Sequence, residues 1–373
     1  MFANPKLPWV KVAVGRRRGK LIRGGGCRNF SGLCVSILEL QFLSNKPLTM
    51  PKAIVMDEQP GKPGKVYWPL KTITVSLPTP GPDEVVVRTL CAALNHRDLF
   101  ARQKLYRGAA GNIPILADGC GIVVGRVCDF GGTKQYPDGT CQEFIRVPSS
   151  QVLACPPHLS DAKAAAIPLA ALTAWRATMV KAAVSPGQRV LVTGIGGGVA
   201  LFSLQFAVAA AGAEVWVTSG SAEKIAKAIK LGAKGGVSYK EKDWAEKLLK
   251  VASKGGKGGL FDAIIDGAGG DVITTAVVLL RTGGIVASYG MTVGPKVVFP
   301  MTAVMRNIEM RGSTMGSRAE LADAVRYISS KRIIPVVDSV HSVSNIEDAF
   351  DVMKAGTNFG KIVVRVQQET AKI

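Results

Sequence analysis

Short apolar runs rich in β-branched residues recur along residues 50–155, and Pro or Gly residues separate them. Runs of this length and composition, bounded by turn residues, predict β-strands. We therefore expect a mostly β domain after Met50. Its predicted strands cover residues 52–56, 73–77, 84–94 and 121–127.

The pattern changes after residue 160. A helix is predicted over residues 161–183, with Ser160 placed to cap its N-terminus. Apolar strands then alternate with helical stretches, and such alternation predicts a parallel sheet with helices on both faces. The predicted strands of this sheet are residues 189–194, 214–219, 235–239, 261–267, 283–290 and 308–313.

The tail combines both patterns. Two helices and a final strand are predicted there, at residues 317–330, 345–356 and 360–366. The chain is thus expected to divide into a mostly β part over 50–167, an alternating part over 168–312, and a tail over 313–373.

The first 49 residues differ from the rest in charge. They contain nine Lys or Arg and one acid, Glu39, and so supply +8 of the net charge of +20. One alternative is a mitochondrial transit peptide, since such peptides are rich in Arg and poor in acids. The other, which we favour, is a disordered basic leader before a true start at Met50.

The remaining charge of +12 raises the question of nucleic-acid binding. The chain has no aromatic-basic motif of an RNA-binding domain, so no nucleic-acid partner is expected.

The seven cysteines form no C-x-x-C pair, which favours a reducing compartment over a zinc ribbon or disulfide scaffold. Because Gly interrupts the most apolar runs, no membrane span is expected. We expect a cytoplasmic protein, or a mitochondrial one if residues 1–49 are a transit peptide.

A cluster of glycines carries the strongest local signal. Gly194, Gly196, Gly197 and Gly198 follow a predicted strand and open a helix, with Val199 next. Glycines let the backbone turn tightly and approach a pyrophosphate, and the helix N-terminus adds exposed N–H groups. This stretch predicts a dinucleotide site.

The strand that follows the glycine turn lacks an expected acid. About twenty residues past such a turn, an Asp or Glu holds the ribose 2′-hydroxyl of NAD. Here the strand ends in the sequence TSGS. Hydroxyl and cationic donors could instead hold a 2′-phosphate, so NADPH is the predicted cofactor. These donors are Ser219, Ser221, Lys224 and Tyr239.

The motifs GIGGGVA, SGSAEK, LTAW and GKIVVRV, found between Met50 and Val366, resemble the medium-chain dehydrogenase/reductase superfamily. Within it, the chain is most similar to the zinc-free, quinone-oxidoreductase-like branch. The resemblance implies an α/β fold, with a GroES-like substrate domain over 50–167 and a Rossmann doubly wound parallel sheet over 168–312. The tail, 313–373, would return to the substrate domain.

The resemblance also implies cofactor contacts. The family's dinucleotide fingerprint falls on Ile195, Gly197 and Ala200. Other positions would lie along the nicotinamide or near the cofactor. These are Thr173, Gly290, Met291, Thr292 and Lys361.

Relatives that use zinc begin its site with a Cys-His pair. Here Asn95 takes the Cys position and is followed by His96 and Asp98, while Ala117 and Leu169 stand where further ligands would be. Tetrahedral zinc needs three or four converging donors, so no metal is expected. His96 is expected to be a polar residue near the cleft or a satisfied surface histidine.

Without a metal, side chains must polarise the substrate. We predict Asn95 as a hydrogen-bond donor and Tyr106 as a donor to the developing oxyanion. Tyr106 matches a tyrosine that lines the cleft in relatives, although it could equally be a surface ring. The predicted activity is NADPH-dependent, zinc-independent reduction of a quinone, enone or related carbonyl. The alternatives are an alcohol or enoyl reductase of the same fold and a cofactor-binding protein without turnover; homodimer formation stays open.

One departure from the family concerns the substrate domain. After Gly125, roughly thirty to forty residues of the family pattern have no counterpart in this chain, and they would be β-structure. Loss of strands is expected to leave sheet edges open. The sequence therefore predicts fast amide exchange over residues 85–147 and supports cofactor binding more strongly than turnover.

Overall fold

The computed structural model describes seven stretches of the chain, with only the backbone considered at 126–129. They are residues 50–106, 108–122, 126–129, 138–209, 212–253, 258–294 and 296–367. The predicted leader, residues 1–49, and Gly125 lie outside the described residues.

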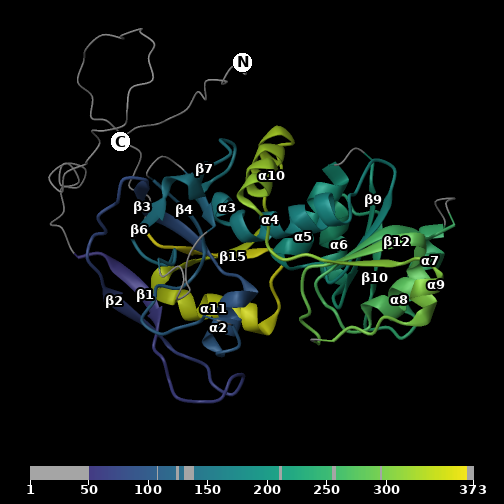
Figure 1. The fold of residues 1–373 in the computed structure, drawn as a ribbon, viewed down its shortest axis with the longest axis horizontal. Helices are drawn as coiled ribbons and strands as arrows, with labels where there is room; N and C mark the ends of the chain where they lie inside the picture. Colours follow the sequence, from purple (N-terminus) through teal and green to yellow (C-terminus); the bar gives the residue numbers. More distant parts are fainter. Residues whose placement is uncertain are drawn as a thin grey trace, which may run out of the picture.

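Two sheets organise the chain, one on each side of a central pair of helices (Figure 1). The central helices are α4 (Pro168–Trp175) and α5 (Gly198–Ala209). Aromatic rings pack where they meet: Trp175 and Phe206 lie edge to face with centroids 5.4 Å apart. No helix in the described part of the chain is long and apolar enough to cross a membrane.

In the described residues the first sheet has seven strands, in the order β14-β15-β3-β4-β5-β7, with β6 also paired to β3. A separate antiparallel pair, β1 (Lys52–Met56) and β2 (Leu70–Thr74), lies beside it. Strand β15 comes from the tail and pairs antiparallel with β3, so the last strand completes the first sheet. The strands are β3 (Glu84–Ala93), β4 (Asp118–Ile122), β5 (Arg126–Asp129), β6 (Phe144–Pro148), β7 (Val152–Ala154), β14 (Val337–Ser342) and β15 (Lys361–Arg365).

Two strand predictions in this region were wrong in detail. The run 121–127 was expected to be one strand, but it contributes to two antiparallel strands, with Gly121 opposite Arg126. The strand predicted at 73–77 lies at 70–74, because its partner β1 begins at Lys52, opposite Thr74.

The helix predicted over 161–183 is also interrupted. It forms α3 (Asp161–Ala165), α4 and a π-helical segment at Arg176–Lys181. Pro168 has no N–H to continue a helix but is favourable at a first helical position, where it begins α4. Ser160 does occupy the N-cap of α3, although its side chain makes no capping hydrogen bond.

The second sheet is parallel, with its described strands in the order β10-β9-β8-β11-β12-β13. The order reverses between β8 and β11, and ligands of such sheets bind beyond the carboxyl ends of the strands at that point. The predicted fold class, a mostly β domain with a Rossmann sheet, is confirmed. The strands are β8 (Arg189–Val192), β9 (Glu214–Ser219), β10 (Gly235–Ser238), β11 (Phe261–Asp266), β12 (Leu280–Ser288) and β13 (Glu309–Gly312).

Further helices cover the two sheets. On the side of the second sheet, which we call the second lobe, they are α6 (Ala222–Lys230), α7 (Trp244–Ser253), α8 (Val272–Leu279) and α9 (Met301–Met305). The first lobe and the junction carry α2 (His96–Arg102), α10 (Arg318–Ser330) and α11 (Ile346–Ala355). The buried guanidinium of Arg102 binds both carboxylate oxygens of Glu347, at 2.7 and 2.8 Å, and so ties α2 to α11.

The pairing of β5 changes the expectation for the shortened domain. Its backbone pairs with β4 on one side and β7 on the other, so this strand has no open edge. We now expect the amides of β4, which lies between β3 and β5, to exchange slowly with or without cofactor. Hydrogen exchange followed by mass spectrometry tests this, with β8 as the comparison, since NADPH should protect β8 further. Exchange of residues 118–122 at the rate of an unfolded peptide would contradict this expectation.

Candidate functional site

The glycine turn after β8 has the geometry of a ligand cradle. Gly194 and Gly196 have φ angles of +61° and +140°, which favour glycine. A Cβ added at Gly194 or Gly197 would meet no atom within 4 Å, so the turn faces open space. Thr218 at the end of β9 anchors the turn, accepting hydrogen bonds from Gly194 N at 3.2 Å and Ile195 N at 2.7 Å.

Gly198 begins α5 and is needed for a different reason. A Cβ there would lie 2.7 Å from Cδ of Lys361 and 3.3 Å from Cβ of Ala170. The helix N-terminus therefore packs directly on the aliphatic stem of a residue from β15. Val199, the next residue, is half-buried against the core at the domain junction.

The two serines predicted to bind a 2′-phosphate have structural roles. Ser219 is buried, and its hydroxyl donates to Ile195 O at 3.4 Å and accepts from Ser221 N at 3.2 Å. The Ser221 hydroxyl caps α6 by accepting from Lys224 N at 3.3 Å. The Ser219 proton is thus used within the turn, and binding of a 2′-phosphate by Ser219 stays a prediction.

Cationic and phenolic groups converge beside Gly220 at the end of β9. The Tyr239 hydroxyl lies 2.9 Å, and Cε of Lys240 2.8 Å, from where a Cβ of Gly220 would stand. Lys224 extends over Gly196 and donates to Gly356 O at 2.8 Å, and burial lowers the pKa of its ammonium group. The sequence reasoning missed Lys240, although its position directly after Tyr239 at the end of β10 is a usable signal.

A cavity of about 390 Å³ lies at the carboxyl ends of β12 and β13. Of the predicted nicotinamide residues, Gly290 and Met291 line it. The Thr292 hydroxyl points elsewhere, donating to Gly267 O at 3.3 Å. Thr173, in α4, does not line the cavity; it is buried, and its hydroxyl contacts Sδ of Met315 at 3.9 Å. The full lining is Ser288, Tyr289, Gly290, Met291, Gly312, Ser313 and Thr314.

A buried ionic network lies between the first sheet and α4. The Lys361 ammonium, on a side chain 4% exposed, donates to Asp118 Oδ2 at 2.9 Å, Asn95 Oδ1 at 2.5 Å and Leu94 O at 2.6 Å. Asn95 Nδ2 donates to Asp118 Oδ2 at 3.0 Å, and Leu169 N donates to Asp118 Oδ1 at 2.9 Å. Every polar atom of this network therefore has a protein partner.

This network engages the amide of Asn95, whose role as a hydrogen-bond donor to the substrate stays a prediction. The second proton of its amide faces Ala93 O at 3.5 Å, so the group is occupied inside the protein rather than presented to a substrate. Its backbone N–H donates to Asp98 at 2.8 Å, and burial raises the pKa of that carboxyl to about 6. The short helix α2 begins with His96, whose ring packs edge-on against Phe100 and whose pKa is lowered by burial.

Tyr106, the other predicted catalytic residue, follows the end of α2. Its side chain is 37% exposed, and the Arg97 guanidinium lies 4.9 Å from its ring centroid. A cation at this distance holds an aromatic ring in place. Its hydroxyl stays a candidate donor.

The residues at the expected metal position do not fit zinc. Ala117 offers no donor, Leu169 uses its backbone N–H on Asp118, and Asn95 is held by Lys361. Within the described ranges no three His, Cys, Asp or Glu side chains group as metal ligands. The polar groups at this position are the Asn95 amide, the Asp118 carboxylate and the Lys361 ammonium. They are hydrogen-bonded to one another rather than directed at a common metal position.

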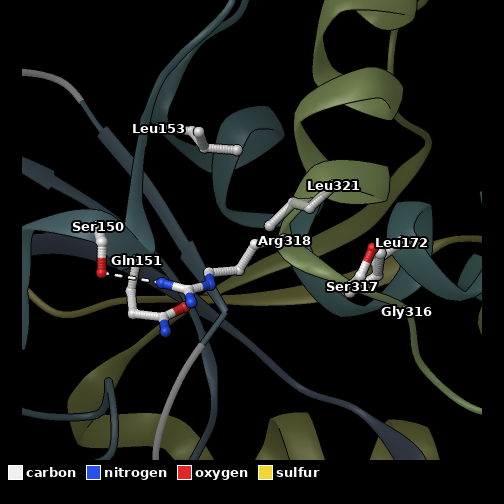
Figure 2. A pocket seen from close by; sticks show the side chains of 8 residues that line it. All are labelled: Ser150, Gln151, Leu153, Leu172, Gly316, Ser317, Arg318 and Leu321. Atoms are coloured by element: carbon white, nitrogen blue, oxygen red, sulfur yellow. Dashed lines mark hydrogen bonds between the residues drawn. The ribbon is translucent and has the colours of Figure 1, made fainter.

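A second cavity, of about 180 Å³, lies between the first sheet and α10 (Figure 2). The Arg318 side chain spans it and donates to Ser150 Oγ at 3.0 Å. Leu172 and Gly316 border it, next in sequence to Thr173 and Met315, so the two cavities share the loop at 313–317. Its lining is Ser150, Gln151, Leu153, Leu172, Gly316, Ser317, Arg318 and Leu321.

Comparison with known proteins gives a consistent picture. A family described as zinc-binding dehydrogenase matches residues 198–330. The zinc-type alcohol dehydrogenase-like protein YogA of Leptosphaeria maculans is 39% identical over 359 positions, which span the whole relative and 85% of this chain. The 359 aligned positions include the whole relative but only 85% of the 373 residues of this chain. The relative therefore has internal residues that have no counterpart here.

Two solved structures have the same fold over most of the chain. An NAD-dependent alcohol dehydrogenase superposes with a TM-score of 0.73 at 28% identity, covering 85% of this chain and 100% of its own. The quinone oxidoreductase of Thermus thermophilus, also solved in complex with NADPH, superposes with a TM-score of 0.71 at 27% identity, covering 84% and 99%.

Removing one partner of the buried network should be costly. In Lys361→Met, the Asp118 carboxylate stays buried without its counter-ion, and we expect a loss of about 3–5 kcal/mol in the free energy of unfolding. The double variant Asp118→Asn/Lys361→Met removes both charges and should recover most of this loss. Urea denaturation of the three chains measures the difference. A loss below about 1 kcal/mol in the single variant would show that the pair is not a structural requirement.

Proposed function

Since the chain belongs to the medium-chain dehydrogenase/reductase superfamily and is therefore an oxidoreductase that uses a nicotinamide cofactor, we propose that it is an NADPH-dependent, zinc-independent reductase of quinones, enones or related carbonyls. The observation that carries the proposal is the end of β9, where an acid is absent and Tyr239 and Lys240 lie beside Gly220, while Lys224 extends over the glycine turn at Gly196.

Electrostatics at this strand end favour a phosphorylated ribose. The nearest acid along the chain, Glu223, is 2.7 Å from the Lys227 ammonium and is directed to its own helix. Lys224 and Lys240 can form charge-assisted hydrogen bonds with a phosphate, and the N-terminus of α6 adds a favourable dipole. Lys224 already has Asp338 and Glu223 as nearby acids, so the phosphate is proposed as a further anion for this lysine.

The chain's residues have separate tasks in this proposal. The glycine turn and the α5 N-terminus bind the pyrophosphate through backbone N–H groups. Gly290 and Met291 form a wall of the cavity for the nicotinamide half. The bound cofactor supplies the hydride. Tyr106 donates a hydrogen bond to the oxygen of the substrate, and Asp98 keeps the Asn95 backbone in position.

Quinones and enones are proposed as substrates because their reduction needs no metal. The positions of zinc ligands are filled by groups already bonded within the protein. The likeness to a quinone oxidoreductase that was solved with NADPH supports the same choice.

Cofactor preference is the first test. We expect the chain to bind NADPH at least tenfold more tightly than NADH. Lys224→Ala and Lys240→Ala should each weaken NADPH binding by about 1–2 kcal/mol, as for a charge-assisted hydrogen bond, and leave NADH binding nearly unchanged. Titration of cofactor fluorescence measures both affinities.

Lys227→Ala is the matched control. It removes a lysine from the same helix that already pairs with Glu223, so neither affinity should change. Equal losses for NADPH and NADH in the Lys224 and Lys240 variants would contradict a 2′-phosphate site.

Turnover is the second test. NADPH oxidation should be detected with members of a panel of quinones and enones, and chelator treatment should leave the rate unchanged. Metal analysis of the purified chain should give less than one zinc per chain. A rate that falls on chelation and returns with zinc would contradict metal independence, and tight NADPH binding without turnover would favour the cofactor-binding alternative.

A further inference from the structure

Two cysteine side chains lie in direct contact beside the first sheet. The sulfur atoms of Cys120 and Cys155 are 3.5 Å apart, and both residues are free thiols. A disulfide bond is about 2.05 Å long, so the two sulfurs need to approach by only about 1.5 Å to form one. The contact therefore places two thiols within reach of a covalent bond.

The contact joins two segments that the first sheet keeps apart. Cys120 lies in β4 opposite Val127 of β5, and Val127 is in turn paired with Leu153 of β7. Cys155 follows β7 and leads toward α3, which packs on β3 and β4. The chain thus turns back across β5 and brings Cys155 onto one face of β4. A bond between the two thiols would connect β4 to the segment before α3.

The two thiols differ in their access to solvent. Cys120 is 3% exposed within the core cluster of the domain junction, whereas Cys155 is half-buried against that cluster. The hydrogen bond with the Cys155 thiol, together with burial, raises the pKa of Cys120, so its thiol stays protonated at neutral pH. Oxidation of cysteine follows exposure and thiolate character. Cys155 is therefore the thiol that a dissolved oxidant reaches first, and Cys120 lies directly behind it.

We propose that Cys120 and Cys155 are a redox modification site, at which a hydroperoxide produces a reversible disulfide. An accessible cysteine with a second cysteine beside it is the arrangement of a redox sensor. In a reducing compartment such a disulfide is transient, because cellular thiols reduce it again. The proposal does not depend on the cofactor, since neither residue lines the cavity at the ends of β12 and β13.

The reaction with hydrogen peroxide proceeds in two steps. Cys155 loses its proton, and its sulfur attacks one peroxide oxygen; the O–O bond breaks, and the hydroxide that leaves takes up a proton to become water. The Cys120 sulfur then attacks the sulfenic acid of Cys155, the S–O bond breaks, and a second water leaves with the Cys120 proton. The two thiols together lose two electrons, and one peroxide is reduced to two waters.

The bond would form on the strand that carries the buried ion pair. Cys120 lies two residues after Asp118 in β4, so both side chains leave the same face of the sheet. Asp118 binds Lys361 of β15 and the Leu169 amide at the start of α4. Oxidation of Cys120 therefore adds a covalent connection at the junction that this ion pair already holds.

Peptide mapping of the full, reduced chain tests the proposal. The chain is treated with hydrogen peroxide, its remaining thiols are alkylated in denaturant, and a tryptic digest is analysed by mass spectrometry. Cleavage at Arg126 and Arg146 places Cys120 and Cys155 in different peptides. We expect these peptides to appear as a linked pair in most chains and to separate on reduction with dithiothreitol. In urea most of this yield should be lost, because the fold no longer holds the two thiols together.

Three variants sharpen the test. Cys155→Ala should leave Cys120 as an unoxidised thiol, and Cys120→Ala should leave Cys155 as a sulfenic acid that dimedone labels. Cys141→Ala is the matched control, since Cys141 is fully buried in a different core cluster and its loss should leave the linked pair unchanged.

Circular dichroism checks that each chain remains folded during the treatment. Recovery of Cys120 and Cys155 as alkylated thiols from a folded, peroxide-treated chain would overturn the proposal. Linkage of Cys155 to any other cysteine, or an equal yield of the linked pair in buffer and in urea, would overturn it as well.

Discussion

A buried ion pair, Lys361 with Asp118, determines how the two lobes of this protein meet. Two charges can be buried together only if hydrogen bonds satisfy their remaining polar atoms. Here Asn95, the Leu94 carbonyl and the Leu169 amide supply those bonds. The pair therefore connects the last strand, the centre of the first sheet and the helix that leads into the Rossmann sheet.

The aliphatic stem of Lys361 extends this connection to the cofactor site. It packs on Gly198, the first residue of α5, where any larger residue would collide with it. One side chain thus contacts both the proposed cofactor site at the α5 N-terminus and, through its strand β15, the first sheet. Lys224 adds a second link, since its ammonium donates to Gly356 at the end of α11. Both domains therefore border the proposed NADPH site.

The loop at 313–317 is also held from two sides. It is held by Arg176 and Glu320 on one side and by the contact of Thr173 with Met315 on the other. It also borders both cavities, so contacts made by α4 and α10 shape the wall that both cavities share.

The sequence by itself determined the features that depend on local chemistry. Alternating strands and helices, the glycine turn and the missing acid after β9 could all be recognised, because period, turn residues and charge are local properties. Only the tertiary structure decided which groups are free to act. It directed the Asn95 amide to Asp118 and the Ser219 hydroxyl to Ile195, and it brought Lys240 beside Gly220. Such partners are distant in sequence or belong to neighbouring strands, and no local pattern specifies the side-chain directions that unite them.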